Sequence, residues 1–237
     1  MRQAGAIAAH VLLKLSDQVK PGVSTEDLDR IAEEMIRAAG AIPTFIGYQG
    51  YPKTLCTSIN EEVVHGIPSR KRILKEGDLI GIDCGVTYKG FVGDHAKTFA
   101  VGTADAQKVK LLTVAEEALE AGIQALKIGN RVGDISAAVQ TVADRHHYGI
   151  VKDFVGHGIG RKMHEEPQVP NFGEVETGPR LKVGMVLAIE PMFNLGTGDV
   201  KVLEDGWTVV TRDGKCSVHF EHTIALTPSG PLVLTRI

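Results

Sequence analysis

The sequence predicts an α+β protein in which antiparallel strands form a central sheet and helices cover it. Apolar residues recur every three or four positions in two pairs of segments, which is the period of an amphipathic helix. Between these pairs the apolar pattern becomes strand-like. Short motifs from the first half of the chain return in the second half. We therefore expect a pseudo-two-fold symmetric fold.

Four segments carry the helical pattern. Residues 4–15 are apolar, but His10 and Lys14 interrupt them, so an amphipathic helix is favoured over a signal peptide. Ser24 and the acidic Asp27 three residues later are typical of a helix start, and apolar residues then recur until Gly40. The second pair of helices is expected at about 104–126 and 134–146.

Five segments read as strands because they are rich in apolar and β-branched residues and are bounded by turn residues. We expect them to pair as hairpins. They are residues 78–84, 91–101, 184–189, 207–211 and 217–226.

Composition excludes several classes of protein. The 237 residues are 43% hydrophobic and carry a net charge of −3, and no run of basic residues exceeds 70–72, so no nucleic-acid binding is predicted. No apolar segment approaches the roughly 20 residues that span a bilayer, so no membrane association is expected. The three cysteines are far apart with no Cys-x-x-Cys pair, which suits a reducing, cytoplasmic location.

An internal repeat brings four acidic residues to attention. Residues 77–83 match residues 184–190 at an offset of 107, and each segment is an apolar strand ending in an acid, Asp83 or Glu190. Asp94 and Glu221 are each followed by a histidine and open a further strand. Folding by pseudo-symmetry would bring the four acids together. Since neighbouring carboxylates repel one another in a partly dry site, we expect metal ions between them.

A histidine between glycines is the natural nitrogen ligand for such a cluster. His157 lies in the segment Gly-His-Gly-Ile-Gly at 156–160, where the glycines let the backbone approach closely. The same pattern could be a phosphate loop. No clear strand-to-helix unit surrounds it, so nucleotide binding is not favoured.

Ten ordered motifs resemble the type I methionine aminopeptidases of the bacterial or organellar kind, which are pita-bread metallopeptidases of family M24. They cover nearly the whole chain. The motifs lie at residues 48–53, 58–60, 64–68, 82–83, 93–94, 156–160, 164–168, 189–192, 205–207 and 221–223.

The resemblance implies two divalent metal ions, of which Mn²⁺, Fe²⁺ and Co²⁺ suit an oxygen-rich ligand set with one imidazole. Position by position, the ligands fall on Asp83, Asp94, His157, Glu190 and Glu221. Asp94 and Glu221 would bridge the two ions. Asp83 would complete one site, and His157 with Glu190 would complete the other.

The resemblance also implies how a peptide would be hydrolysed. Two dications would make a bridging water available as hydroxide near neutral pH. Glu190 would accept its proton, and the non-ligand histidines His65 and His164 would hydrogen-bond the scissile peptide.

A substrate pocket and a monovalent cation site follow from the same resemblance. The methionine pocket would be lined by Tyr48, Tyr51, Cys56, His65 and Trp207, with Phe45 and Met163 tuning selectivity. Asn60 and Ser217 match positions near a Na⁺ or K⁺ site.

We therefore expect a single catalytic metallopeptidase domain, 1–237, with pseudo-symmetric halves at about 1–103 and 104–237. It would remove initiator methionine from nascent chains whose second residue is small, as a monomer, and the ribosome is one place where it could meet them. Two alternatives stay open. A proline-directed peptidase on this scaffold usually carries an additional N-terminal domain, and a non-catalytic binding protein typically lacks some of the ligands.

Overall fold

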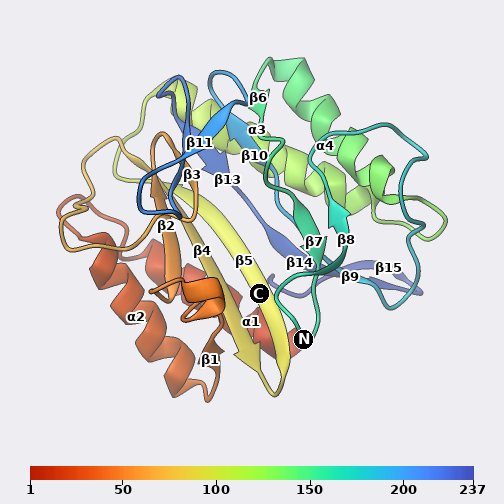
Figure 1. Cartoon of the computed structure of the whole chain (residues 1–237), viewed down its shortest axis with the longest axis horizontal. Coiled ribbons are helices and arrows are strands. Elements are labelled where there is room, and N and C mark those ends of the chain that lie inside the picture. The colour runs from red at the N-terminus through yellow and green to blue at the C-terminus, as the bar shows by residue number, and fades with distance from the viewer.

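The computed structural model describes residues 1–237, and all four expected helices are present in it (Figure 1). They are α1 (Arg2–Ser16), α2 (Thr25–Ala38), α3 (Ala106–Ala125) and α4 (Val132–His146). Ser24 caps α2 as predicted, since its side chain accepts a hydrogen bond from the Asp27 backbone N–H and the Asp27 carboxylate accepts one from the Ser24 backbone N–H. A short 3₁₀ turn lies at Tyr48–Gly50.

Fifteen strands accompany these helices, and every pairing between them is antiparallel. Many are too short to be recognised from a local pattern. The strands are β1 (Ile42–Pro43), β2 (Leu55–Ile59), β3 (Glu62–Val64), β4 (Leu79–Tyr88), β5 (Phe91–Ala100), β6 (Gly149–Ile150), β7 (Gly156–Gly158), β8 (Glu165–Val169), β9 (Val186–Ile189), β10 (Met192–Asn194), β11 (Val200–Val202), β12 (Val209–Thr211), β13 (Ser217–His219), β14 (His222–Thr227) and β15 (Gly230–Val233).

The expected hairpin between 78–84 and 91–101 is confirmed, because β4 and β5 pair along their whole length. The prediction of one continuous strand at 217–226 is wrong. The chain changes sheets there: β13 pairs with β10, whereas β14 pairs with β9. Between them the backbone N–H of Glu221 bonds to the Ala96 carbonyl of β5, at an N···O distance of 2.8 Å. The break therefore places Glu221 at a junction of sheets.

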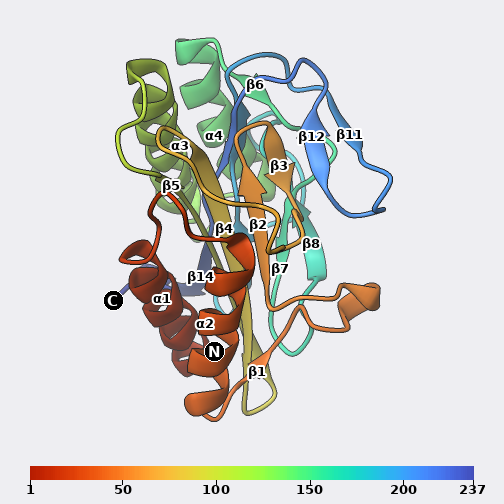
Figure 2. The ribbon, with the colours of Figure 1, turned by 90° about the vertical axis from the view of Figure 1, so that its left-hand side faces the viewer.

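The helices pack on the strands from one side, and the loops around β7, β8, β11 and β12 lie on the other (Figure 2). One apolar core lies between α1, α2 and the sheet containing β4. A second core lies between α3, α4 and the strands of the second half, including β9 and β14. Each half thus contributes a helix pair and an antiparallel strand pair.

Strands β5 and β14 join the two halves. The Asp94 backbone N–H donates to Thr223 Oγ1 at 2.9 Å, and that hydroxyl donates to the Asp94 carbonyl at 2.7 Å. With the Glu221–Ala96 bond these contacts hold the start of β14 against the middle of β5. Asp94 and Glu221, which are 127 positions apart in the sequence, become neighbours for this reason.

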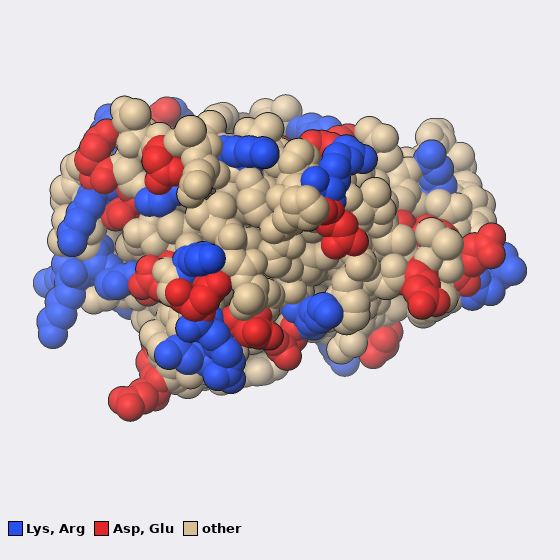
Figure 3. All heavy atoms as spheres, turned by 90° about the horizontal axis from the view of Figure 1, so that it is seen from above, with Lys and Arg blue, Asp and Glu red and all other residues tan.

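Charged side chains of both signs are interspersed on the face seen from above, with uncharged surface between them (Figure 3). Exposed pairs such as Arg145 and Glu117, 3.2 Å apart, link α4 to α3. Such pairs contribute less than about 1 kcal/mol each. No helix combines the length and the apolar composition that crossing a bilayer requires.

A buried carboxylate fastens α2 to the start of β2, and its removal should destabilise the fold. Asp29 Oδ1 accepts hydrogen bonds from the backbone N–H groups of Thr54 and Leu55, at 2.9 and 2.8 Å. In Asp29→Ala both buried donors lose their partner, so we expect the free energy of unfolding to fall by about 3 kcal/mol. Urea unfolding measures this. Asp29→Asn keeps an acceptor oxygen and should lose less; an Ala variant as stable as the parent would contradict this role.

Candidate metal centre and active site

Strand register puts Asp83 and Asp94 on one face of the β4–β5 hairpin. Asp94 stands opposite Gly85, and residues opposite each other on antiparallel strands point to the same face. Asp83 is two residues from Gly85 on β4 and so shares that face. Cys56 of β2 stands opposite Asp83, so its side chain lies on the same face of the sheet as the two acids.

Strand register also places Glu190 and Glu221 of the second half next to each other. The β9–β14 register pairs Ile189 with His222, so the next pair outward is Glu190 and Glu221. Glu221 is 1% exposed, and its carbonyl lies 2.6 Å from Nδ1 of His95. Because a carbonyl oxygen only accepts, that nitrogen of His95 carries the proton.

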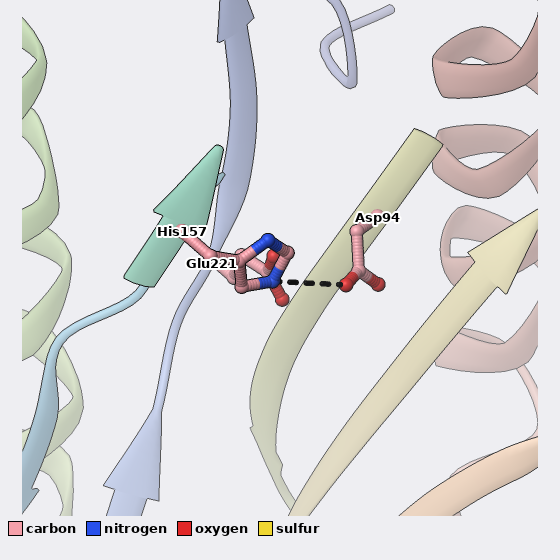
Figure 4. A group of neighbouring side chains, drawn as sticks. All are labelled: Asp94, His157 and Glu221. Carbon is pink, nitrogen blue, oxygen red and sulfur yellow. Dashed lines mark ion pairs between the residues drawn. The ribbon is translucent and has the colours of Figure 1, made fainter. Parts of the chain in front are cut away.

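His157 on β7 completes the cluster. Its Nδ1 lies 2.8 Å from the Gly158 carbonyl and must donate to it, which leaves Nε2 as a bare nitrogen. That Nε2 lies 3.6 Å from Glu190 Oε1 and 4.0 Å from Asp94 Oδ2. In Figure 4 the side chains of Asp94, His157 and Glu221 come from three separate strand regions and point toward one another. One ligand atom from each of these three lies within 4.8 Å of the other two.

The donor atoms of this cluster fit a cation. Asp83 Oδ1, Asp94 Oδ1 and Glu221 Oε1 are buried and have no hydrogen-bond partner. Burial, and then the charge of Asp94, raise the pKa of Asp83, Glu190 and Glu221 well above the usual carboxyl range. Burial raises the pKa of Asp94 itself to about 7. Buried carboxylates in this number are stable as anions only beside positive charge, so the cluster is suited to divalent metal ions.

The two predicted non-ligand histidines line the same cavity as the acidic cluster. His65 follows β3 with a φ of 60°, and its ring meets Phe154 and Trp207 edge-on. Burial lowers the pKa of His65 to about 4. The His164 ring lies 4.2 Å from that of His157, centroid to centroid, and its Nδ1 is 2.7 Å from the Tyr48 hydroxyl.

All the predicted ligands, histidines and pocket residues line one cavity with about 170 Å³ of free space, room for one side chain and a few water molecules at about 30 Å³ each. Its apolar end is formed by Phe45, Tyr51, Cys56, Met163 and Trp207. The Tyr51 hydroxyl lies 2.9 Å from the Leu55 carbonyl and 3.0 Å from the Gly66 carbonyl. It therefore ties the loop after His65 to the pocket wall.

Gly85 leaves room for this apolar end. A Cβ at Gly85 would lie 2.6 Å from Cε1 of Phe45, well inside van der Waals contact. The absence of a side chain opposite Asp94 thus lets an aromatic ring approach the acidic face of the sheet.

Asn60 and Ser217 do not line the cavity. They lie together elsewhere, where the Ser217 backbone N–H donates to the Asn60 carbonyl at 2.8 Å. The Asn60 side chain bonds to Asp78 and to the Leu79 N–H.

Five residues of the cavity wall were not predicted: Gln49, Val64, Phe154, Val155 and His219. For most of them no sequence pattern indicates a place on the cavity wall, because long-range folding of loops and other strands puts them there. His219 is an exception. It precedes Glu221 by two positions in a segment that reads as a strand, where alternate residues share a face.

Comparison with known proteins supports these observations. The model of metallopeptidase family M24 matches residues 1–228. The methionine aminopeptidase of Clostridium acetobutylicum is 51% identical, over 99% of this chain and 94% of that protein. Methionine aminopeptidase 1 of Bacillus subtilis is also 51% identical, over 100% of this chain and 95% of that protein.

Solved structures agree on the fold and confirm the pita-bread expectation. The methionine aminopeptidase of Thermotoga maritima superposes with a TM-score of 0.99 at 42% identity, covering 100% of this chain and 95% of that one. The prolidase of Pyrococcus furiosus superposes with a TM-score of 0.77 at 24% identity, and this chain covers 62% of it. The likeness to prolidase shows a shared fold alone.

Proposed function

Because the chain belongs to metallopeptidase family M24, we propose that it is a methionyl aminopeptidase, which removes the N-terminal methionine from polypeptides whose second residue is small. The observation that carries this proposal is the 51% identity to methionine aminopeptidases along essentially the full length of both chains. The buried cluster of Asp94, His157 and Glu221 supports a metal-dependent hydrolase.

Five residues would hold two divalent ions, taken to be Mn²⁺, Fe²⁺ or Co²⁺: Asp83, Asp94, His157, Glu190 and Glu221. When bound, these ions would lower the pKa of a shared water, so that hydroxide is available near neutral pH. The bare Nε2 of His157 and the unpartnered oxygens of Asp83, Asp94 and Glu221 support this ligand set.

Glu190 is proposed to take the proton of the attacking water and pass it to the leaving amine. Its carboxylate lines the cavity, and burial together with the charge of Asp94 raises its pKa above the usual carboxyl range, which favours uptake of a proton. His65 and His164 would hydrogen-bond the scissile peptide and the charge that develops on its oxygen. Both side chains line the cavity that holds the acidic cluster, which supports these roles.

The apolar end of the cavity would bind the methionine side chain. Aromatic rings and the Cys56 and Met163 sulfurs make a soft lining that suits a flexible thioether. The small free volume supports a pocket for one side chain.

The remaining expectations stay proposals. The enzyme would act as a monomer in the cytoplasm on nascent polypeptide N-termini, at the ribosome or after release. Residues 1–237 would form one catalytic domain with pseudo-symmetric halves at about 1–103 and 104–237. Asn60 and Ser217 would adjoin a Na⁺ or K⁺ ion.

The test removes metal with a chelator and adds back Mn²⁺, Fe²⁺ under anaerobic conditions, Co²⁺ or Zn²⁺ singly. Methionine release from Met-Ala-Ser should return with metal, whereas Met-Lys-Ser should be cleaved poorly because its second side chain is large. Metal should also raise the thermal midpoint of unfolding by mass action. Equal turnover of both peptides, or no turnover with any metal in folded protein, would count against the proposal.

A further inference from the structure

His219 is a buried histidine on the cavity wall that the proposed mechanism does not use. It ends β13 and is 4% exposed. Its backbone is clamped by Thr98 of β5, whose hydroxyl accepts from the His219 N–H and donates to the His219 carbonyl, both at 2.9 Å. The ring is therefore carried by a rigid part of the sheet and reaches into the same cavity as the acidic cluster.

One nitrogen of this ring has no partner. Nε2 of His219 is fully enclosed and makes no hydrogen bond. An unsatisfied buried polar atom is destabilising, so a nitrogen left in this state points to a contact that forms in the working protein. The neighbouring charged group is Glu190, whose Oε2 lies 3.5 Å from this nitrogen. A small movement of either side chain brings the pair within hydrogen-bond distance.

Two imidazole rings flank the Glu190 carboxylate, and they differ in whether the nitrogen that faces it can donate a hydrogen bond. On one side, Oε1 lies 3.6 Å from Nε2 of His157, which is bare because Nδ1 of that ring donates to Gly158. On the other side, Oε2 faces Nε2 of His219. No hydrogen bond fixes Nδ1 of His219, so the proton of its neutral ring is free to sit on Nε2 and point at Glu190.

We propose that His219 is a positioning residue for Glu190: it donates a hydrogen bond from Nε2 to Oε2 and so directs Oε1 toward His157 and the metal ligands. This inference rests on the proposed function, in which Glu190 is both ligand and proton acceptor. The neutral donor adds no charge to the cluster. It restricts rotation of a carboxylate whose other neighbouring side chain, His157, faces it with a bare nitrogen and donates no hydrogen bond to it.

The experiment compares His219→Leu, which removes the donor, with His219→Gln, whose terminal amide can still donate. In the metal-loaded protein, His219→Leu should lower kcat for Met-Ala-Ser by about 10- to 100-fold, the range seen when partners of metal ligands are lost. KM should change little. His219→Gln should keep kcat within about threefold of the parent if one hydrogen bond is what matters. His10→Gln, on the exposed face of α1, is the matched control and should behave as the parent.

A second readout does not depend on turnover. Calorimetry of Co²⁺ binding to chelator-stripped protein, and the visible absorption of the Co²⁺ complex, report ligand number. The proposal expects the parent stoichiometry and spectrum in His219→Gln. A changed spectrum, with His219→Gln as inactive as His219→Leu, would make His219 a metal ligand and overturn the positioning role.

Two further outcomes are decisive. A kcat in His219→Leu equal to that of the parent would overturn the inference. If the Leu variant does not fold, His219→Met replaces it, because Met also lacks a hydrogen-bond donor. If the parent itself cleaves no peptide with any metal, the proposed function fails. The contact with Glu190 is then tested by Co²⁺ affinity, which should fall in His219→Leu and recover in His219→Gln, and equal affinities in both would reject it.

Discussion

Asp94→Asn is expected to abolish metal-restored cleavage of Met-Ala-Ser, with a loss of kcat/KM well beyond the roughly 100-fold that disturbing a ligand's partner produces. Asp94 is 3% exposed, and one of its oxygens has no hydrogen-bond partner. The amide has nearly the same shape as the carboxylate but one anionic oxygen fewer to share between two ions. Metal affinity measured by calorimetry should fall with the activity.

The same substitution should affect stability in the opposite direction when metal is absent. The charge of Asp94 is among the causes that raise the pKa of Asp83, Glu190 and Glu221, so removing it relieves repulsion in the cluster. The stripped Asp94→Asn variant should therefore unfold at a higher temperature than the stripped parent, and metal should no longer raise that temperature. Asp144→Asn, on the exposed face of α4, is the control. Full metal-restored turnover in Asp94→Asn would favour a role for the cluster other than catalysis.

His65→Ala is expected to lower kcat by about 100- to 1000-fold, the range seen when one donor to a developing oxyanion is lost. The ring is held against Phe154 and Trp207, and it lines the cavity that also holds His164 and the acidic cluster. Because the contribution is made to the transition state, KM for Met-Ala-Ser should change far less than kcat.

Measuring metal affinity distinguishes a role of His65 in the transition state from a role in holding the metal site. His65 is not among the proposed ligands, so calorimetry of His65→Ala should give the parent metal affinity. His65→Gln, which keeps a donor, should recover part of the lost kcat. A variant that loses metal affinity and kcat together would show that His65 acts on the metal site, and an unchanged kcat would remove it from the mechanism.

Local patterns were sufficient for the helices and for the main hairpin. The helices were predictable because their apolar residues recur every three or four positions, which is a pattern between close neighbours in the sequence. The Ser24 cap of α2 likewise depends on Asp27, three residues away. The β4–β5 hairpin was predicted because the strand-like segments 78–84 and 91–101 follow each other in the sequence, and the structure places the turn between them at Lys89 and Gly90. Strands of two or three residues, such as β6 and β7, carry too little pattern to be seen.

The sequence by itself determined which residues are chemically suited to a metal site, since Asp83, Asp94, Glu190 and Glu221 stand at the ends or in the middle of apolar strands where an unpaired acid is costly. The internal repeat predicted that these acids meet, but only the tertiary structure decided which contacts bring them together. The break at Glu221, the bond from its N–H to Ala96 and the Thr223 contacts with Asp94 are all long-range. The placement of His219 beside Glu190 follows from the same junction. Contacts of this kind depend on how sheets from the two halves register with one another, and no local period encodes that register.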